Sequence, residues 1–242
     1  MKYADVNGKL ADYRRQISDI RERMRETLAV VEPEEVSDYE FATFDGSVRL
    51  SQLFGDHEDL IVVHNMGVAC PNCTLWADGY NGIHQHVVSR AGFVVSSPDR
   101  PVVQRKFAES RGWKFPMVSH ERSSFAADMG YATDKGGWLP GVSVFRREGD
   151  TITRVSDTGF SPGDDFCPLW HFFDMLPGGV GDWPRIDVVD GDRSSLVCRM
   201  KEMVDRLSAV IAEVSAGASV LADASYEISA PRSNCCCPTT AL

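Results

Sequence analysis

The stretch that decides the fold, Asp59–Asn81, reads DLIVVHNMGVACPNCTLWADGYN. It opens with the apolar run 60–63, whose β-branched residues are typical of a strand buried on both faces. A turn of small residues follows, and the motif C-P-N-C at 70–73 then precedes a segment of helical character. A C-x-x-C motif between a buried strand and a helix predicts a thiol–disulfide redox site.

The order of the two cysteines predicts their roles. At the first cap position of the helix, the thiolate of Cys70 would be stabilised by unpaired backbone N–H groups and by the positive end of the helix. Pro71 falls at the first helical position, where a missing N–H costs nothing. Cys73 lies one turn further on the same face and can close a disulfide with Cys70. We therefore expect Cys70 to attack a substrate and Cys73 to resolve the mixed disulfide.

Two other interpretations of the motif stay open. A C-x-x-C can be half of a zinc site, but the sequence holds no second C-x-x-C and no H-x-x-x-H. His64, Cys167 and His171 could supply further ligands only through a long-range convergence. The two cysteines could also be inert core residues. The redox interpretation needs no metal and no cofactor.

Charge and composition restrict the partners. The chain has 242 residues and a formal net charge of −10, which argues against binding to nucleic acid or to anionic membranes. No apolar run approaches membrane-spanning length, and the first residues lack the apolar core of a signal peptide. We expect a cytoplasmic protein, in which most of the seven cysteines stay reduced, acting on a thiol or disulfide of a protein or small molecule.

The flanking pattern predicts an α/β fold with parallel crossovers, because strand and helix signals alternate. Gly79 and Gly82 are expected to divide the helix after the motif into two pieces. The remaining expected elements are a hairpin at 39–50 with its turn at Asp45-Gly46, a strand at 92–97, a helix from Pro98 to Gly112, an extended link at 115–119, a short helix at 123–129, and a hairpin at 139–155.

The two ends are predicted as appendages to one central domain. The expected segments are an N-terminal helix (1–34, with its periodic part at 9–32), a domain (35–180), a linker (181–194), an amphipathic helix (195–225) and a disordered Cys-rich tail (226–242). Each terminal helix carries an apolar stripe, which either packs on the domain or pairs with a second copy in a homodimer. The adjacent thiols of Cys235-Cys236-Cys237 could bind copper(I) or zinc, serve as a tethered substrate of Cys70, belong to a processed peptide, or have no role.

Five stretches together resemble the bacterial thioredoxin-like family catalogued as domain of unknown function 899. They are LIVVHNM (60–66), CPNCTLWADGYNG (70–82), GWKFPMVS (112–119), LPGVSVFRREGD (139–150) and FFDMLPGG (172–179), and the resemblance covers about residues 9–180. The run 94–119 also resembles peroxiredoxins of the alkyl-hydroperoxide-reductase class.

The resemblance implies a thioredoxin-like fold, a central mixed sheet flanked by helices, with Cys70 and Cys73 at the redox position. Pro140 matches the cis-proline of thioredoxins, so a cis Leu139–Pro140 peptide is expected. His64 stands where thioredoxins place a buried acid and could accept a proton from Cys73, or it could be a core histidine. Peroxiredoxins need a hydroxyl residue and a proline just before the reactive cysteine. This chain has Gly67 and no proline there, which argues against peroxidase activity.

The aromatic segment 161–178 is expected to form a helix that closes the core. A second interpretation places Cys167 and His171, one turn apart, at the Cys70 site as a further thiol and base. The sequence therefore favours a thiol–disulfide oxidoreductase. The alternatives are a thiol-rich metal-binding or redox-sensing protein and a thiol-dependent peroxidase.

Overall fold

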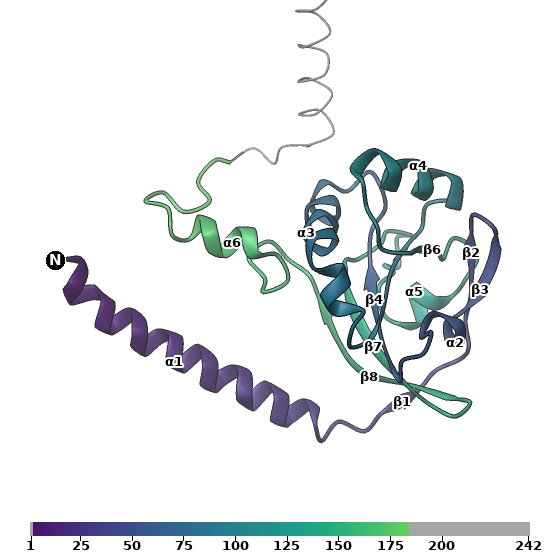
Figure 1. Cartoon of the computed structure of the whole chain (residues 1–242), viewed down its shortest axis with the longest axis horizontal. Helices are drawn as coiled ribbons and strands as arrows, with labels where there is room; N and C mark the ends of the chain where they lie inside the picture. The colour runs from purple at the N-terminus through teal and green to yellow at the C-terminus, as the bar shows by residue number, and fades with distance from the viewer. Residues whose placement is uncertain (1, 184–242) are drawn as a thin grey trace, which may run out of the picture. The chain divides into compact units, whose positions relative to one another are not determined.

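The computed structural model describes residues 2–183 (Figure 1). The predicted amphipathic helix 195–225 and the tail with Cys235-Cys236-Cys237 lie outside the described residues, as does most of the predicted linker.

One mixed sheet, with strand order β1-β8-β7-β4-β5-β6-β2-β3, forms the centre of the domain. β4, β5 and β6 run parallel, and the β7–β8 hairpin lies antiparallel beside β4. The fold is therefore α/β and thioredoxin-like, as predicted. The strands are β1 (Glu34–Glu35), β2 (Glu40–Thr43), β3 (Gly46–Arg49), β4 (Asp59–His64), β5 (Gly92–Ser97), β6 (Met117–Ser119), β7 (Gly141–Glu148) and β8 (Thr151–Gly159).

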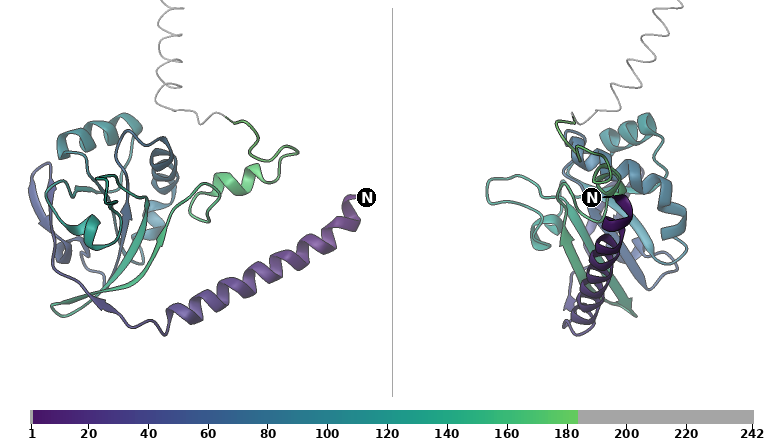
Figure 2. Two further views of the ribbon diagram at one scale, coloured as in Figure 1. Left: turned by 180° about the vertical axis from the view of Figure 1, so that it is seen from behind. Right: turned by 90° about the vertical axis from the view of Figure 1, so that its left-hand side faces the viewer.

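Helices cover both faces of the sheet (Figures 1 and 2). The helices are α1 (Tyr3–Leu28), α2 (Leu50–Leu53), α3 (Pro71–Val87), α4 (Pro101–Arg111), α5 (Phe125–Asp128) and α6 (Pro168–Phe173). On one face, Leu60 and Val62 of β4 pack with Phe125 in what we call the α2–α5 core. On the other face, Val63 packs with Trp76 and Tyr80 in the α3–α4 core. The alternation of side chains along β4 thus directs successive residues into different cores.

Both predicted hairpins are confirmed. β2 and β3 pair antiparallel around the Asp45-Gly46 turn, where Gly46 has a φ of +139°. β7 and β8 pair along their length, with one irregularity between Val144 and Phe145. The segment expected as an extended link contributes β6 to the sheet, because Met117 pairs with Val95. The helix after β5 ends as predicted at Gly112, which has a φ of +67°.

The prediction of two helical pieces after the motif is wrong, because α3 runs unbroken through both glycines. Gly79 and Gly82 lie in a regular helix, although each costs about 1 kcal/mol relative to alanine. Trp76 and Tyr80 from the same helix are buried against the sheet, and burying a large apolar side chain contributes about 2 kcal/mol or more. Tertiary packing therefore outweighs the local preference.

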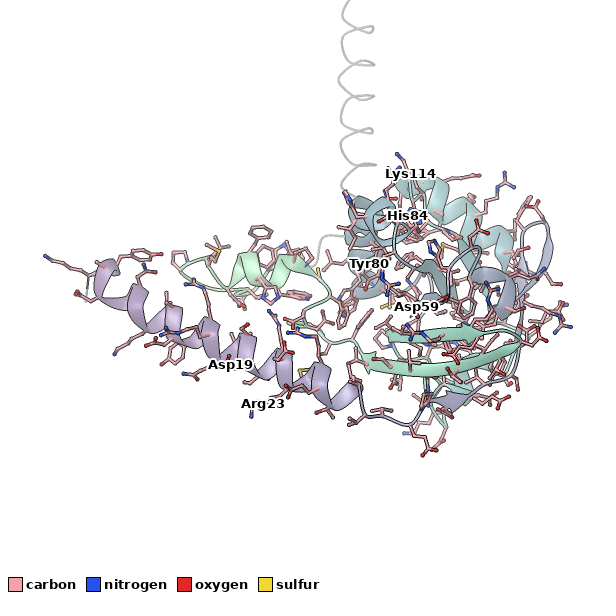
Figure 3. All side chains as sticks on the ribbon, turned by 60° about the horizontal axis from the view of Figure 1, so that its bottom comes forward. Asp19, Arg23, Asp59, Tyr80, His84 and Lys114 are labelled. Atoms are coloured by element: carbon pink, nitrogen blue, oxygen red, sulfur yellow. The ribbon has the colours of Figure 1, made fainter. Side chains whose placement is uncertain are left out.

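α1 begins and ends earlier than the periodic segment 9–32, and no described residue of it is buried. Charged residues such as Asp19 and Arg23 project from it (Figure 3), and its apolar stripe, which includes Ile17 and Ile20, is exposed. Pairing of this stripe with a second copy stays a prediction. Within residues 2–183, no helix has both the length and the apolar character needed to cross a membrane.

Candidate active site

Cys70 is the N-cap of α3, as predicted, and Pro71 occupies the first turn. Its sulfur accepts a hydrogen bond from the backbone N–H of Cys73, with an Sγ–N distance of 3.2 Å. The side chain thus satisfies a helix N–H that otherwise has no partner in the first turn. An N–H donor and the positive end of a 17-residue helix both favour a negative charge on this sulfur.

Cys73 lies one turn further and is more deeply buried, with 3% of its surface exposed against 9% for Cys70. Its hydrogen bond with Cys70, followed by burial, raises the pKa of the Cys73 thiol well above its usual range. The backbone N–H of Met66 donates to the same sulfur at 3.4 Å and acts in the opposite direction, lowering that pKa. Cys73 therefore keeps its proton while the Cys70 sulfur accepts hydrogen bonds.

The turn at 65–69 connects β4 to this thiol pair. Asn65 Oδ1 accepts the N–H of Gly67 at 2.8 Å, and Gly67 O accepts the N–H of Cys70 at 3.0 Å. Asp99, which follows β5, accepts the N–H of Val68 at 2.9 Å. Sequence reasoning missed Asn65 and Asp99. The Asn-x-Gly spacing of an Asx turn was the available signal for Asn65.

His64 ends β4 with its ring in the α2–α5 core, on the face of the sheet opposite α3. Only 2% of its surface is exposed, and its ring stacks on Tyr131 with a centroid distance of 3.7 Å. Nε2 lies 2.9 Å from Ser143 Oγ, whereas Nδ1 has no hydrogen-bond partner. Burial, followed by the neighbouring His120 and Arg154, lowers the pKa of His64 to about 3. These contacts are those of a core histidine, and proton transfer from Cys73 stays a prediction.

A second buried histidine, His120, was not singled out from the sequence. Nδ1 lies 2.9 Å from Ser96 Oγ, Nε2 has no hydrogen-bond partner, and the ring meets Trp138 edge-on. Burial lowers the pKa of His120 to about 4. His64 pairs with Ser96 across β4 and β5, and the Ser96 hydroxyl contacts His120. Both histidines therefore lie near the carboxyl edge of the sheet. Both are neutral at pH 7.

The expectation of a cis Leu139–Pro140 peptide is wrong, because this bond is trans in the structure. An X–Pro bond favours trans by about 0.5–1 kcal/mol, and the chain enters β7 in that form. Gly141 pairs with His64, so Pro140 lies at the edge of the sheet from which the 65–69 turn departs. A role for Pro140 in presenting its backbone to the thiols stays a prediction.

Cys167 and His171 do not share one environment. Cys167 is buried in the α3–α4 core, where burial raises the pKa of its thiol. Burial also raises the pKa of the Tyr80 phenol, and the nearby Asp164, Cys167 and Cys73 raise it further. His171 is instead exposed, with Nε2 3.4 Å from Asp165 Oδ1. The structure therefore brings Cys167, but not His171, into the core beside α3.

No group of three or more His, Cys, Asp or Glu side chains in residues 2–183 is placed to hold a metal ion. Asp59, which is labelled in Figure 3, forms ion pairs with the guanidinium groups of Arg90 and Arg146, each at 2.9 Å. These contacts with Arg146 and Arg90 lower the pKa of Asp59.

The fold and the site define a thioredoxin-like protein with a two-cysteine motif at the start of the helix after a central strand. The chain belongs to the family described as bacterial protein of unknown function (DUF899), whose model matches residues 11–193. A comparison with curated proteins finds no match.

Solved structures with a similar fold include peroxiredoxins. A mutant of Xanthomonas campestris peroxiredoxin Q is 17% identical, with a TM-score of 0.43 over 50% of this chain and 78% of that one. Mycobacterium tuberculosis peroxidoxin BcpB is 22% identical, with a TM-score of 0.43 over 56% and 88%. Reduced Vibrio vulnificus Prx3, in complex with H2O2, is 13% identical, with a TM-score of 0.45 over 56% and 90%. Likeness at this level carries no statement about the activity of this chain.

Proposed function

We propose that this chain is a thiol–disulfide oxidoreductase in which Cys70 is the attacking thiolate and Cys73 the resolving thiol. The observation that carries the proposal is the Cys70 sulfur at the N-terminus of α3, which accepts the Cys73 N–H at 3.2 Å. The neighbouring thiol of Cys73 stays protonated beside it. One nucleophile and one proton-bearing partner on successive turns are what two-step exchange requires.

The reaction balances in two steps. The Cys70 thiolate attacks one sulfur of a substrate disulfide, so the substrate S–S bond breaks, a mixed disulfide forms and one substrate thiolate leaves. Cys73 then loses its proton and attacks Cys70, which forms the Cys70–Cys73 disulfide and expels the second substrate sulfur, to which that proton passes. The substrate gains two electrons and the cysteine pair loses two.

The substrate class is a disulfide of a protein or a small molecule, and the reductant that restores the thiols is a dithiol. We place the activity in the cytoplasm, where such reductants keep most thiols reduced. The exposed apolar stripe of α1 is proposed to pair with a second copy of the chain.

The test is reduction of a model protein disulfide by wild type, Cys70→Ser, Cys73→Ser and Cys167→Ser. We expect Cys70→Ser to abolish turnover and Cys73→Ser to trap a mixed disulfide on Cys70, visible by mass spectrometry. Cys167→Ser is the matched control, since it also replaces a buried thiol, and it should keep turnover within about twofold. Wild-type turnover by Cys70→Ser would refute the proposal.

The peroxidase alternative is tested with the same proteins. Gly67 stands where a peroxiredoxin would carry a hydroxyl residue, so we expect hydrogen peroxide to be consumed no faster than by an ordinary exposed thiol. Rapid consumption that depends on Cys70 would favour the peroxidase function instead.

A further inference from the structure

Asp99 lies in the loop after β5, next to the turn that leads into the thiol pair. Its Oδ2 accepts the backbone N–H of Val68 at 2.9 Å and the hydroxyl of Ser97 at 3.1 Å. Gly67 stands against the same carboxylate, because a Cβ built on Gly67 would lie 2.9 Å from Asp99 Oδ2. With a φ of +102°, Gly67 also adopts a conformation that other residues rarely take. The carboxylate therefore packs directly on the backbone of the 65–69 turn.

The turn that Asp99 holds donates one backbone hydrogen bond to the sulfur of the resolving cysteine. Met66, the residue before Gly67, donates its backbone N–H to the sulfur of Cys73 at 3.4 Å. An N–H aimed at a sulfur stabilises the thiolate more than the thiol, since hydrogen bonds to a charged acceptor are stronger. The thiol of Cys73 is buried and hydrogen-bonded to Cys70, and both raise its pKa, so it needs such a donor when it loses its proton.

We propose that Asp99 is a positioning residue for the resolving thiol: it fixes the 65–69 turn so that the Met66 N–H stabilises the Cys73 thiolate during the second step. This inference rests on the proposed function. The step is the one in which Cys73 attacks Cys70, the Cys70–substrate S–S bond breaks and the proton of Cys73 ends on the departing substrate sulfur. Asp99 touches neither sulfur. The hydrogen bond that the Cys70 sulfur accepts comes from the Cys73 N–H of α3 and not from the 65–69 turn, so we expect the loss of Asp99 to leave the first attack by Cys70 largely unchanged.

The experiment separates the two steps in a single turnover. The reduced full chain is mixed with an aromatic disulfide that releases a coloured thiolate, once when Cys70 attacks and once when Cys73 resolves. In Asp99→Ala we expect the first release to stay within about twofold of wild type. The second release should slow about tenfold, the effect of losing one well-aligned hydrogen bond to a charged group. The second release of Asp99→Ala should also need a higher pH than that of wild type to reach the same rate, because the Cys73 thiolate has lost a hydrogen-bond donor.

Asp38 provides a matched control for the loss of a loop carboxylate. Its carboxylate also accepts one backbone N–H and one serine hydroxyl, both from Ser51, at 2.8 and 2.9 Å. Asp38→Ala should change neither release rate nor the pH profile. A loss of stability alone would therefore be distinguished from a loss of positioning.

Two other variants keep the inference testable if Asp99→Ala does not fold. Asp99→Asn preserves the size of the side chain and removes its charge, and Gly67→Ala places a methyl group against the carboxylate. Asp99→Asn should slow the second release and keep the first within about twofold. Gly67→Ala, whose carbonyl accepts the Cys70 N–H, is used for the second release only, which it should also slow. Wild-type kinetics of the second release in these two variants would overturn the role of Asp99. If wild type itself shows no first release, the proposed function fails as well, and this result differs from the loss of the second release alone.

Discussion

Acid should destabilise this protein in a pH range set by its two buried histidines. His64 and His120 are each 2% exposed, and burial lowers their pKa values to about 3 and about 4. Both therefore stay neutral in the folded chain, whereas in the unfolded chain they take up protons below their ordinary pKa of 6.5. Unfolding binds protons, so stability falls as the pH drops below 6.5 and continues to fall toward the folded-state values.

The magnitude follows from the distance between pH 5 and the ordinary pKa. The difference is about 1.5 pH units, and each unit corresponds to about 1.4 kcal/mol of unfolding free energy. Each histidine therefore lowers the stability at pH 5 by about 2 kcal/mol relative to high pH. Together they remove about 4 kcal/mol, a large part of the 5–15 kcal/mol that is typical of a domain. The pKa of Asp59 is lowered in the folded chain, so its contribution to stability is lost only below its ordinary pKa of 3.8. This lies below the range of pH 5 to 7.5 considered for the histidines.

The assay is urea unfolding followed by tryptophan fluorescence at pH 7.5 and pH 5. We expect wild type to lose about 4 kcal/mol between the two, and His64→Gln and His120→Gln each to lose about half of that, whatever their stability at pH 7.5. His86→Gln, on the exposed side of α3, is the control and should keep the wild-type difference. A wild-type difference below about 1 kcal/mol would show that the two rings are not held neutral by burial.

Two further predictions concern packing. Gly141→Ala should cost about 3 kcal/mol of unfolding free energy by urea denaturation, because its Cβ would lie 2.2 Å from Tyr131 Cε1 and 2.6 Å from Thr158 O. Gly159→Ala on the paired strand, whose Cβ meets only Pro140 O at 3.8 Å, should cost under about 1 kcal/mol, and equal costs would contradict the packing argument. Asp78→Ala should cost about 3 kcal/mol, since it leaves the guanidinium of Arg111 buried without its carboxylate. Glu109→Ala, which breaks an exposed pair with Arg105, should stay within about 0.5 kcal/mol, and a comparable loss there would argue against burial as the cause.

The sequence predicted those parts of the fold that depend on local signals. The β-branched run before the motif, the Asp45-Gly46 turn and the Gly112 helix end each have a backbone requirement that specific residues meet. The cap position of Cys70 was predicted for the same reason. Pro71 is compatible with the first turn of a helix but not with the helix interior, so the helix must begin at Pro71. The unbroken α3 could not be predicted in this way, since the burial of Trp76 on the sheet is a tertiary contribution.

The histidines illustrate a different limit. His64 was singled out by its position relative to the cysteines, but a residue at the end of a strand can point to either face. Only the register and the alternation along β4 show that it lies with Tyr131 in the α2–α5 core. His120 carried no signal, because its burial depends on Trp138 and on Ser96 of another strand. Pro140 was matched by analogy, and analogy does not determine the isomer of the bond before it.

The contact between Asp99 and the 65–69 turn follows from strand order more than from any motif. β4 and β5 are parallel neighbours, so their carboxyl ends meet at one edge, and the loops that follow them must lie side by side. One loop carries the backbone that reaches Cys73, and the other carries the carboxylate that holds this backbone. The prediction of parallel crossovers therefore already implied that a residue just after β5 could influence the thiol pair. The prediction of parallel crossovers could not identify Asp99 itself. The contact of Asp99 with the turn depends on Gly67, which has no side chain, so that the carboxylate can approach to within about 3 Å of the position where a Cβ would lie.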